Sequence, residues 1–96
     1  IKISDPAADL AVITALISSI QDIPVARDMC FAGEVGLSGE VRAVSRIEQR
    51  VQEADRLGFD SIIIPQANLK AIKNKDFQIH IVPVAKVEEL MEVIFG

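Results

Sequence analysis

The sequence predicts a small α/β domain, and three of its features support that fold class. The β-branched run Ile62-Ile63-Ile64, closed by Pro65, is typical of a strand that is buried on both faces of a sheet. Apolar residues recur with the helical period in two segments, 47–57 and 87–94. The 96 residues are 50% hydrophobic and 25% charged, which is the composition of one packed globular domain.

Composition also excludes several classes of function. With one cysteine (Cys30) and one histidine (His80), the chain has neither a disulfide framework nor a metal centre built from Cys and His. The net charge of −4 means that nucleic-acid binding would need a local basic patch. No apolar run approaches the ~20 residues that span a bilayer, so we expect no membrane partner. We expect Cys30 to be a buried small hydrophobe and His80 to lie half-exposed on a strand.

The first residues predict a strand and then a helix. Residues 1–4 alternate between apolar and polar, and a strand that starts at the first residue indicates a fragment of a longer protein. Asp5 and Pro6 suit the cap and the first position of a helix. The helix that follows, up to Ile20, is apolar on most sides and is expected to be buried.

A β-hairpin follows a loop around Pro24. Residues 29–35 predict one strand and residues 40–44 predict the next. The turn Gly36-Leu37-Ser38-Gly39 between them is short and flanked by glycines, which is a hairpin signal.

The next helix has both of its ends marked in the sequence. Ser45, with Glu48 three residues later, fits a capping box at the start. Gly58 ends the helix. We expect one buried stripe on it, formed by Ile47, Val51, Ala54 and Leu57.

The last third of the chain adds two strands and a helix. The strand at 61–64 is followed by a polar, basic stretch at 68–75, which we expect to form a short helical turn and a loop. Residues 77–84 predict another strand. The final amphipathic helix has an apolar stripe of Val87, Leu90, Met91 and Ile94. The predicted order is α-β-β-α-β-β-α in one domain over residues 1–96.

A motif in the middle of the chain carries a family resemblance. Residues 33–42 read Gly-Glu-Val-Gly-Leu-Ser-Gly-Glu-Val-Arg, and residues 46–50 read Arg-Ile-Glu-Gln-Arg. With Leu57-Gly58-Phe59 and Ile64-Pro65, they resemble the C-terminal Lon-protease-like domain of the bacterial DNA repair family RadA (Sms). Residues 5–11 fit too, so the resemblance covers nearly the whole chain. A shorter form of the motif also occurs in the Lon-like module of ComM-type AAA proteins, but the Arg-Ile-Glu-Gln-Arg stretch favours RadA.

The resemblance implies a fold and a parent protein. The fold would be that of the Lon proteolytic domain, which is ribosomal protein S5 domain 2-like, with a mixed sheet and packed helices. The parent would be a cytoplasmic, DNA-dependent ATPase that promotes branch migration in recombinational repair as a ring-shaped homo-oligomer, expected to be a hexamer. Its ATP, Mg and Zn would bind in parts absent here, so we expect no cofactor in this chain.

The resemblance also locates the Ser–Lys dyad of Lon proteases. The nucleophile position falls on Ala7 and the lysine position falls on Glu48, so neither catalytic group is present. We therefore expect a non-proteolytic scaffold or DNA-contact domain. A peptidase that uses Ser4 and Lys2, which would share one face of a strand, is the alternative.

Two basic clusters are the candidate DNA-binding residues. Like charges at i and i+4 repel, and a cation in the first helical turn opposes the helix dipole, so local stability does not explain Arg46 and Arg50. An external phosphate would explain them, although Glu40, Glu48 and Glu53 could instead pair with the arginines. A loop of lysines can follow phosphates without reading sequence. The candidates are Arg42, Arg46 and Arg50 in one cluster and Lys70, Lys73 and Lys75 in the other.

Overall fold

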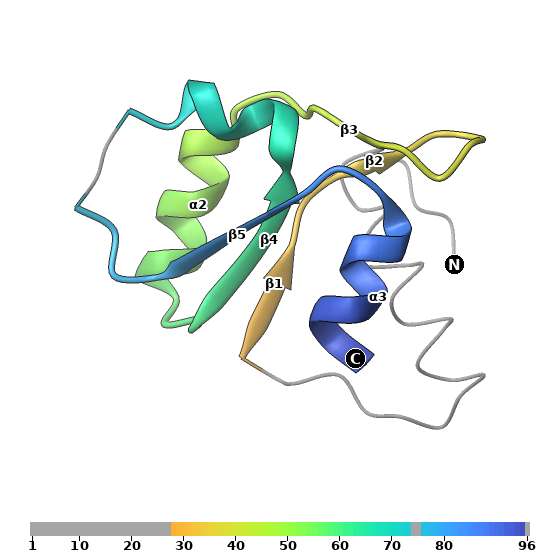
Figure 1. The fold of residues 1–96 in the computed structure, drawn as a ribbon. Helices are drawn as coiled ribbons and strands as arrows, with labels where there is room; N and C mark the ends of the chain where they lie inside the picture. The colour runs from red at the N-terminus through yellow and green to blue at the C-terminus, as the bar shows by residue number, and fades with distance from the viewer. Residues whose placement is uncertain (1–27, 74–75, 96) are drawn as a thin grey trace, which may run out of the picture.

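A parallel three-stranded sheet forms the centre of the chain in the computed structural model, which describes residues 28–73 and 76–95 (Figure 1). Its strand order is β1-β4-β5. Cys30 of β1 pairs with Ile62 of β4, and Ile62 pairs with Ile81 of β5. The strands are β1 (Met29–Phe31), β4 (Ser61–Pro65) and β5 (His80–Val84).

Helices cover both faces of β4, as the β-branched run predicts. Figure 1 shows α2 (Ile47–Arg56) on one side of the sheet and α3 (Val87–Phe95) on the other. Ile62 and Ile64 share a core with residues of α2, whereas Ile63 belongs to a second core with Leu90 of α3. The chain is therefore a three-layer α/β unit over its described residues.

The predicted strand at 29–35 is wrong as one continuous element. Its first half, β1, joins the parallel sheet, and the Ala32 N–H extends this pairing with a 2.9 Å hydrogen bond to the Ile63 carbonyl. The chain then leaves β4, and β2 (Glu34–Val35) pairs antiparallel with β3 (Val41–Arg42). The expected hairpin thus exists, but it is shorter and belongs to a separate two-stranded sheet.

The hairpin is fixed to the start of α3. The Val87 N–H donates to the Gly39 carbonyl at 2.9 Å, and the Val41 N–H donates to the Ala85 carbonyl at 2.8 Å. An amide in the first helical turn has no partner inside the helix, so the turn carbonyl satisfies one of these donors. The last residue of the turn and the strand that follows it are therefore held beside the start of α3.

The capping box expected at Ser45 is not formed. Arg46 is the N-cap, with a left-handed backbone at φ 57°, and no side chain makes a capping hydrogen bond. Its carbonyl accepts the Arg50 N–H at 3.0 Å, which starts the helix one residue later than a Ser45 cap would. Glu48 accepts instead from the backbone N–H of Lys73, at 2.7 Å.

The end of α2 follows the expectation for Gly58. This glycine has φ 88°, its N–H donates to the Asp55 carbonyl, and the Phe59 N–H donates to the Ala54 carbonyl. These two bonds are the Schellman motif that glycine favours at helix ends. The buried stripe holds except at Leu57, which follows the helix and is 60% exposed.

Two further differences concern the edges of the predicted elements. The short helical turn is the 3₁₀ helix η2 (Gln66–Ala71), which begins two residues before the expected segment. Strand β5 begins at His80, so residues 77–79 precede it. Described elements therefore run β-β-β-α-β-3₁₀-β-α, and the strand and helix predicted within residues 1–20 lie outside the described residues.

Candidate nucleic-acid interface

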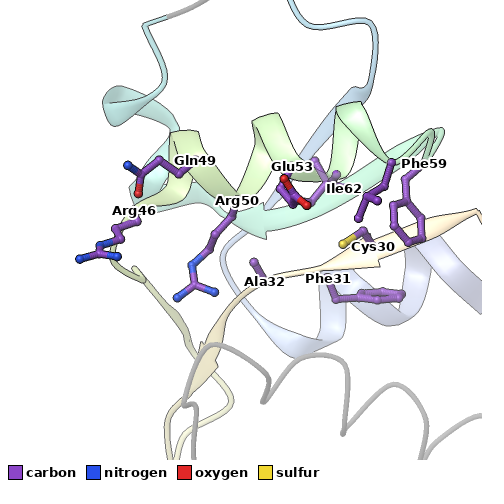
Figure 2. Close-up of a pocket in the computed structure, with 11 residues that line it drawn as sticks. Cys30, Phe31, Ala32, Arg46, Gln49, Arg50, Glu53, Phe59 and Ile62 are labelled. Carbon is purple, nitrogen blue, oxygen red and sulfur yellow. The ribbon is translucent and has the colours of Figure 1, made fainter.

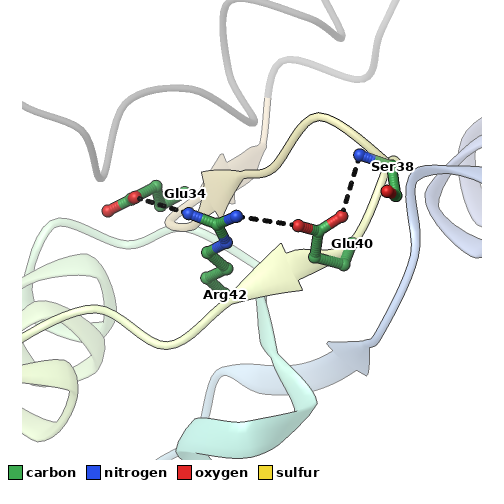
Figure 3. A network of polar contacts seen from close by, with 4 residues as sticks. All are labelled: Glu34, Ser38, Glu40 and Arg42. Atoms are coloured by element: carbon green, nitrogen blue, oxygen red, sulfur yellow. Dashed lines mark hydrogen bonds and ion pairs between the residues drawn. The ribbon is translucent and has the colours of Figure 1, made fainter.

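Arg42 forms its ion pairs within its own hairpin. Its guanidinium lies 2.9 Å from a Glu40 carboxylate oxygen and 3.7 Å from one of Glu34, and Glu40 also accepts the Ser38 N–H at 3.0 Å (Figure 3). Hydrogen bonds from the backbone and from Arg42 lower the pKa of Glu40 below its usual value. Of the expected pairings between acids and arginines, the one with Glu40 is therefore formed.

The two turn glycines explain why the motif needs this residue type. A Cβ built on Gly36 would lie within 2.3 Å of two Glu40 carboxylate atoms, so a side chain there would displace the acid. Gly39 has φ 79°, in the left-handed region that favours glycine, and has open space around it. The motif therefore encodes a closely packed hairpin turn.

Arg46 and Arg50 lie apart from Arg42, at the start of α2. They are on the rim of a cavity of about 450 Å³ between α2 and β1 (Figure 2). The Arg50 Nε donates to the Ser45 carbonyl at 2.9 Å, which orients its side chain along the first turn. Arg46 is exposed. The structure thus divides the arginine cluster into one structural residue and two that face a concave surface.

The rest of that cavity is mostly apolar. Its polar wall includes Gln49 and Glu53, and Glu53 pairs with Arg56, whose Nε lies 3.1 Å from its carboxylate. This pairing lowers the pKa of Glu53. The apolar lining consists of Cys30, Phe31, Ala32, Ala54, Leu57, Phe59 and Ile62.

The lysine cluster lies partly beside the same end of α2. Lys70 is exposed on η2, and Lys73 is exposed just after it. The bond from the Lys73 N–H to Glu48 joins this segment to the first turn of α2. Lys75 lies outside the described residues, as does Ala7. At the other dyad position, the Glu48 carboxylate accepts the Lys73 N–H and offers no amine that could act as the catalytic base.

Asn68 is a residue that sequence reasoning missed. It is 6% exposed, its Oδ1 accepts the Val44 N–H at 2.8 Å, and its Nδ2 donates to the Val44 carbonyl at 2.9 Å. Two hydrogen bonds therefore hold the segment that leads into Arg46 against η2. The only sequence signal was an Asn in a polar stretch, which does not reveal a partner 24 positions away.

Other residues singled out by the sequence have modest roles. Cys30 is half-buried rather than fully buried, and this burial raises the pKa of its thiol. His80 is exposed, between buried Ile79 and half-buried Ile81. Among the described residues, no group of three His, Cys, Asp or Glu side chains could hold a metal ion. No helix in the described ranges is long and apolar enough to cross a membrane.

Comparison with known proteins gives the same family over the whole chain. Residues 2–96 match the family described as the Lon protease (S16) C-terminal proteolytic domain. The chain is 49% identical over all its 96 residues to the DNA repair protein RadA of Bacillus subtilis, and 42% identical over the same length to that of Streptococcus pneumoniae. It is 54% identical over 68 residues, 71% of the chain, to RadA of Listeria monocytogenes.

The chain is much shorter than these relatives. It spans 21% of the Bacillus subtilis protein, 23% of the Streptococcus pneumoniae protein and 15% of the Listeria monocytogenes protein. The resemblance to the Lon-like domain of RadA, stated from the motif, is confirmed at the level of the whole chain.

Proposed function

The chain belongs to the family of the Lon protease C-terminal proteolytic domain, and we propose that it is a non-proteolytic module of a RadA-type repair protein that contacts DNA. The observation that carries this proposal is the position of Arg46 and Arg50, which line a concave surface, whereas Arg42 is held within its hairpin. The match over all 96 residues to two RadA relatives supplies the biological setting.

The loss of proteolysis rests on the two dyad positions. Ala7 has no nucleophilic oxygen, and Glu48 is a carboxylate that accepts the Lys73 N–H. A Lon-type mechanism needs an amine of lowered pKa beside a hydroxyl to act as general base. Neither position supplies the required group.

The backbone at Arg46 supports an external role for its side chain. A left-handed conformation costs a non-glycine residue roughly 1–2 kcal/mol, and strain of this kind concentrates at functional sites. Arg46 adopts it at φ 57°, where the helix dipole also disfavours a cation. A DNA phosphate beside Arg46 would offset both costs, and Lys70 and Lys73 lie on the segment joined to this turn.

The parent protein is part of the same proposal. It would be a cytoplasmic ATPase that assembles as a homo-oligomeric ring, a hexamer, and acts in recombinational repair by promoting branch migration. ATP, Mg and Zn would bind outside this chain. The module would serve both as a scaffold for assembly and as a wall of the DNA path.

Salt-dependent DNA binding by the full-length protein tests the proposal. Each phosphate contact contributes to the slope of log affinity against log salt about 0.9 on duplex DNA and about 0.7 on a single strand. We expect the Arg46→Gln/Arg50→Gln variant to lower that slope by about 1.8 on a duplex or about 1.4 on a single strand. The control Lys86→Gln removes an exposed cation at the start of α3 that does not line the cavity, and it should leave the slope unchanged. Equal slopes for the arginine variant and the wild type would overturn the DNA contact and leave an assembly scaffold.

The family description favours one second candidate, a surviving peptidase. If it were correct, purified protein would hydrolyse casein, and Ser4→Ala would abolish this activity. We expect no hydrolysis by either protein. A ComM-type parent is distinguished by domain order, since its Lon-like module precedes the ATPase.

A further inference from the structure

The cavity beside β1 has two chemically different ends. Arg46 and Arg50 lie at the start of α2, and Leu57 and Phe59 lie beyond its other end (Figure 2). Between them, Cys30 and Ala54 form part of an apolar floor. The volume of about 450 Å³ lies within the range of small-ligand sites, which are largely apolar with a few placed polar groups.

Charge on the cavity wall also favours an anion. Among the described residues that line it, Glu53 is the one acid, and its carboxylate is held by Arg56, which does not line the cavity. The Gln49 amide adds a donor and an acceptor next to the arginines. A ligand that matches these surfaces has a flat apolar part and an anionic group at one end.

We propose that this cavity holds an unstacked nucleotide, with its base over the apolar floor near Phe59 and its phosphate against Arg46 and Arg50. Bases stack well on aromatic side chains, whereas arginine guanidinium groups pair well with phosphate oxygens. This inference rests on the proposed DNA contact and narrows it to single-stranded DNA, because a duplex keeps its bases stacked and paired. A free mononucleotide has the same chemistry and is the other possible source.

Cys30 provides a readout that other nucleotide sites of the parent do not affect directly. It is the only cysteine of this chain and lines the cavity, so an occupant would shield its thiol from alkylation. The experiment alkylates full-length protein with iodoacetamide and measures the rate at the Cys30 peptide by mass spectrometry. Separate samples contain a single-stranded oligonucleotide, a duplex of equal length, dAMP or inorganic phosphate.

We expect the single strand and dAMP to slow alkylation of Cys30 at least fivefold, and phosphate and duplex to change it less than twofold. Phe59→Leu and, independently, Arg46→Gln should remove most of the protection, while Lys86→Gln should retain it. Arg46 is exposed, so its variant keeps the test valid if Phe59→Leu fails to fold. Protection by dAMP alone would identify the free mononucleotide as the occupant.

Two results would overturn the inference. In the first, the protein binds single-stranded DNA with a salt slope that depends on Arg46 and Arg50, but the alkylation rate of Cys30 does not change. In that case the proposed DNA contact stands and the nucleotide pocket fails. The other is equal protection in the wild type and in both variants, which would place the shielding group elsewhere. Absence of any DNA binding, by contrast, would count against the proposed function itself.

Discussion

Asn68 is the only buried polar side chain among the residues that the structure describes. Its amide pairs with both backbone groups of Val44, much as a neighbouring strand would. Buried backbone groups without a partner are costly, so this one side chain replaces a secondary-structure contact. It connects η2 to the segment that leads into Arg46, and so positions the candidate interface.

Removing this amide should destabilise the domain. Asn68→Ala leaves the Val44 N–H and carbonyl without their partner, and a buried unsatisfied group costs about 1–3 kcal/mol. We expect the free energy of unfolding in urea to fall by this amount. The exposed neighbour in Gln66→Ala is the control and should change it by less than about 0.5 kcal/mol. A loss no larger than the control's would contradict the role of Asn68.

Gly36 and Glu40 should be energetically coupled. A Cβ at Gly36 would meet the Glu40 carboxylate, which must then give up its bonds to Ser38 and Arg42. We therefore expect Gly36→Ala to destabilise the wild type but to cost much less in a Glu40→Ala background. A double-mutant cycle measured by urea unfolding should give a coupling of about 0.5–3 kcal/mol. Additive effects would show that the turn adapts without this contact.

At the scale of elements, the sequence predicts regular helices better than short strands. The α2 stripe and its Gly58 end are local patterns, and the structure contains both. The split at Ala32 depends instead on pairing with β4, which lies about thirty residues away. The capping box predicted at Ser45 is absent for a related reason, because the Glu48 carboxylate accepts a hydrogen bond from the backbone N–H of Lys73, which is distant in the sequence.

The candidate site also shows that the sequence predicts local patterns but not contacts between distant residues. Charge spacing alone groups Arg42, Arg46 and Arg50 as one cluster. The structure separates Arg42, because the hairpin turn brings Glu34 and Glu40 to its guanidinium. The cavity, formed by β1 and α2 together, has no signature in the sequence.

The amino ends of the parallel strands create a pH-dependent contact. Asp28 precedes β1 and Asp60 precedes β4, and the pKa of Asp60 is raised by a hydrogen bond to Asp28 and by its negative charge. His80, at the start of β5, opposes this shift. A raised carboxyl pKa means that the folded state binds the proton more tightly than the unfolded state, so stability falls as pH rises through this range.

Neutralising Asp60 should therefore stabilise the domain at neutral pH. We expect Asp60→Asn to raise the Tm at pH 7, and the gain to shrink as the pH falls toward 3.8, the ordinary pKa of this carboxyl. Glu92→Gln removes one negative charge from an exposed position of α3 and controls for net charge. An equal Tm gain from both variants at pH 7 would assign the effect to net charge rather than to the contact with Asp28.

At the scale of the whole molecule, the sheet separates two cores. The first core contains Ile62 of β4 and Val51 of α2, and the second contains Ile63 of β4 and Leu90 of α3. Because successive side chains of a strand point to opposite faces, neighbouring residues of β4 belong to different layers. A continuous β-branched run is what a strand covered on both sides requires.

This separation predicts which core substitutions interact. Ile63→Val and Leu90→Ala lie in one core, so a double-mutant cycle on their unfolding free energies should show a coupling of at least about 0.5 kcal/mol. Ile62→Val and Leu90→Ala lie on opposite faces, and their effects should add within about 0.5 kcal/mol. Ile62→Val and Ile63→Val should each cost about 0.5–1.5 kcal/mol, since both side chains are fully buried. A negligible cost for Ile63→Val, beside a normal one for Ile62→Val, would mean that α3 does not cover its face of the sheet in solution.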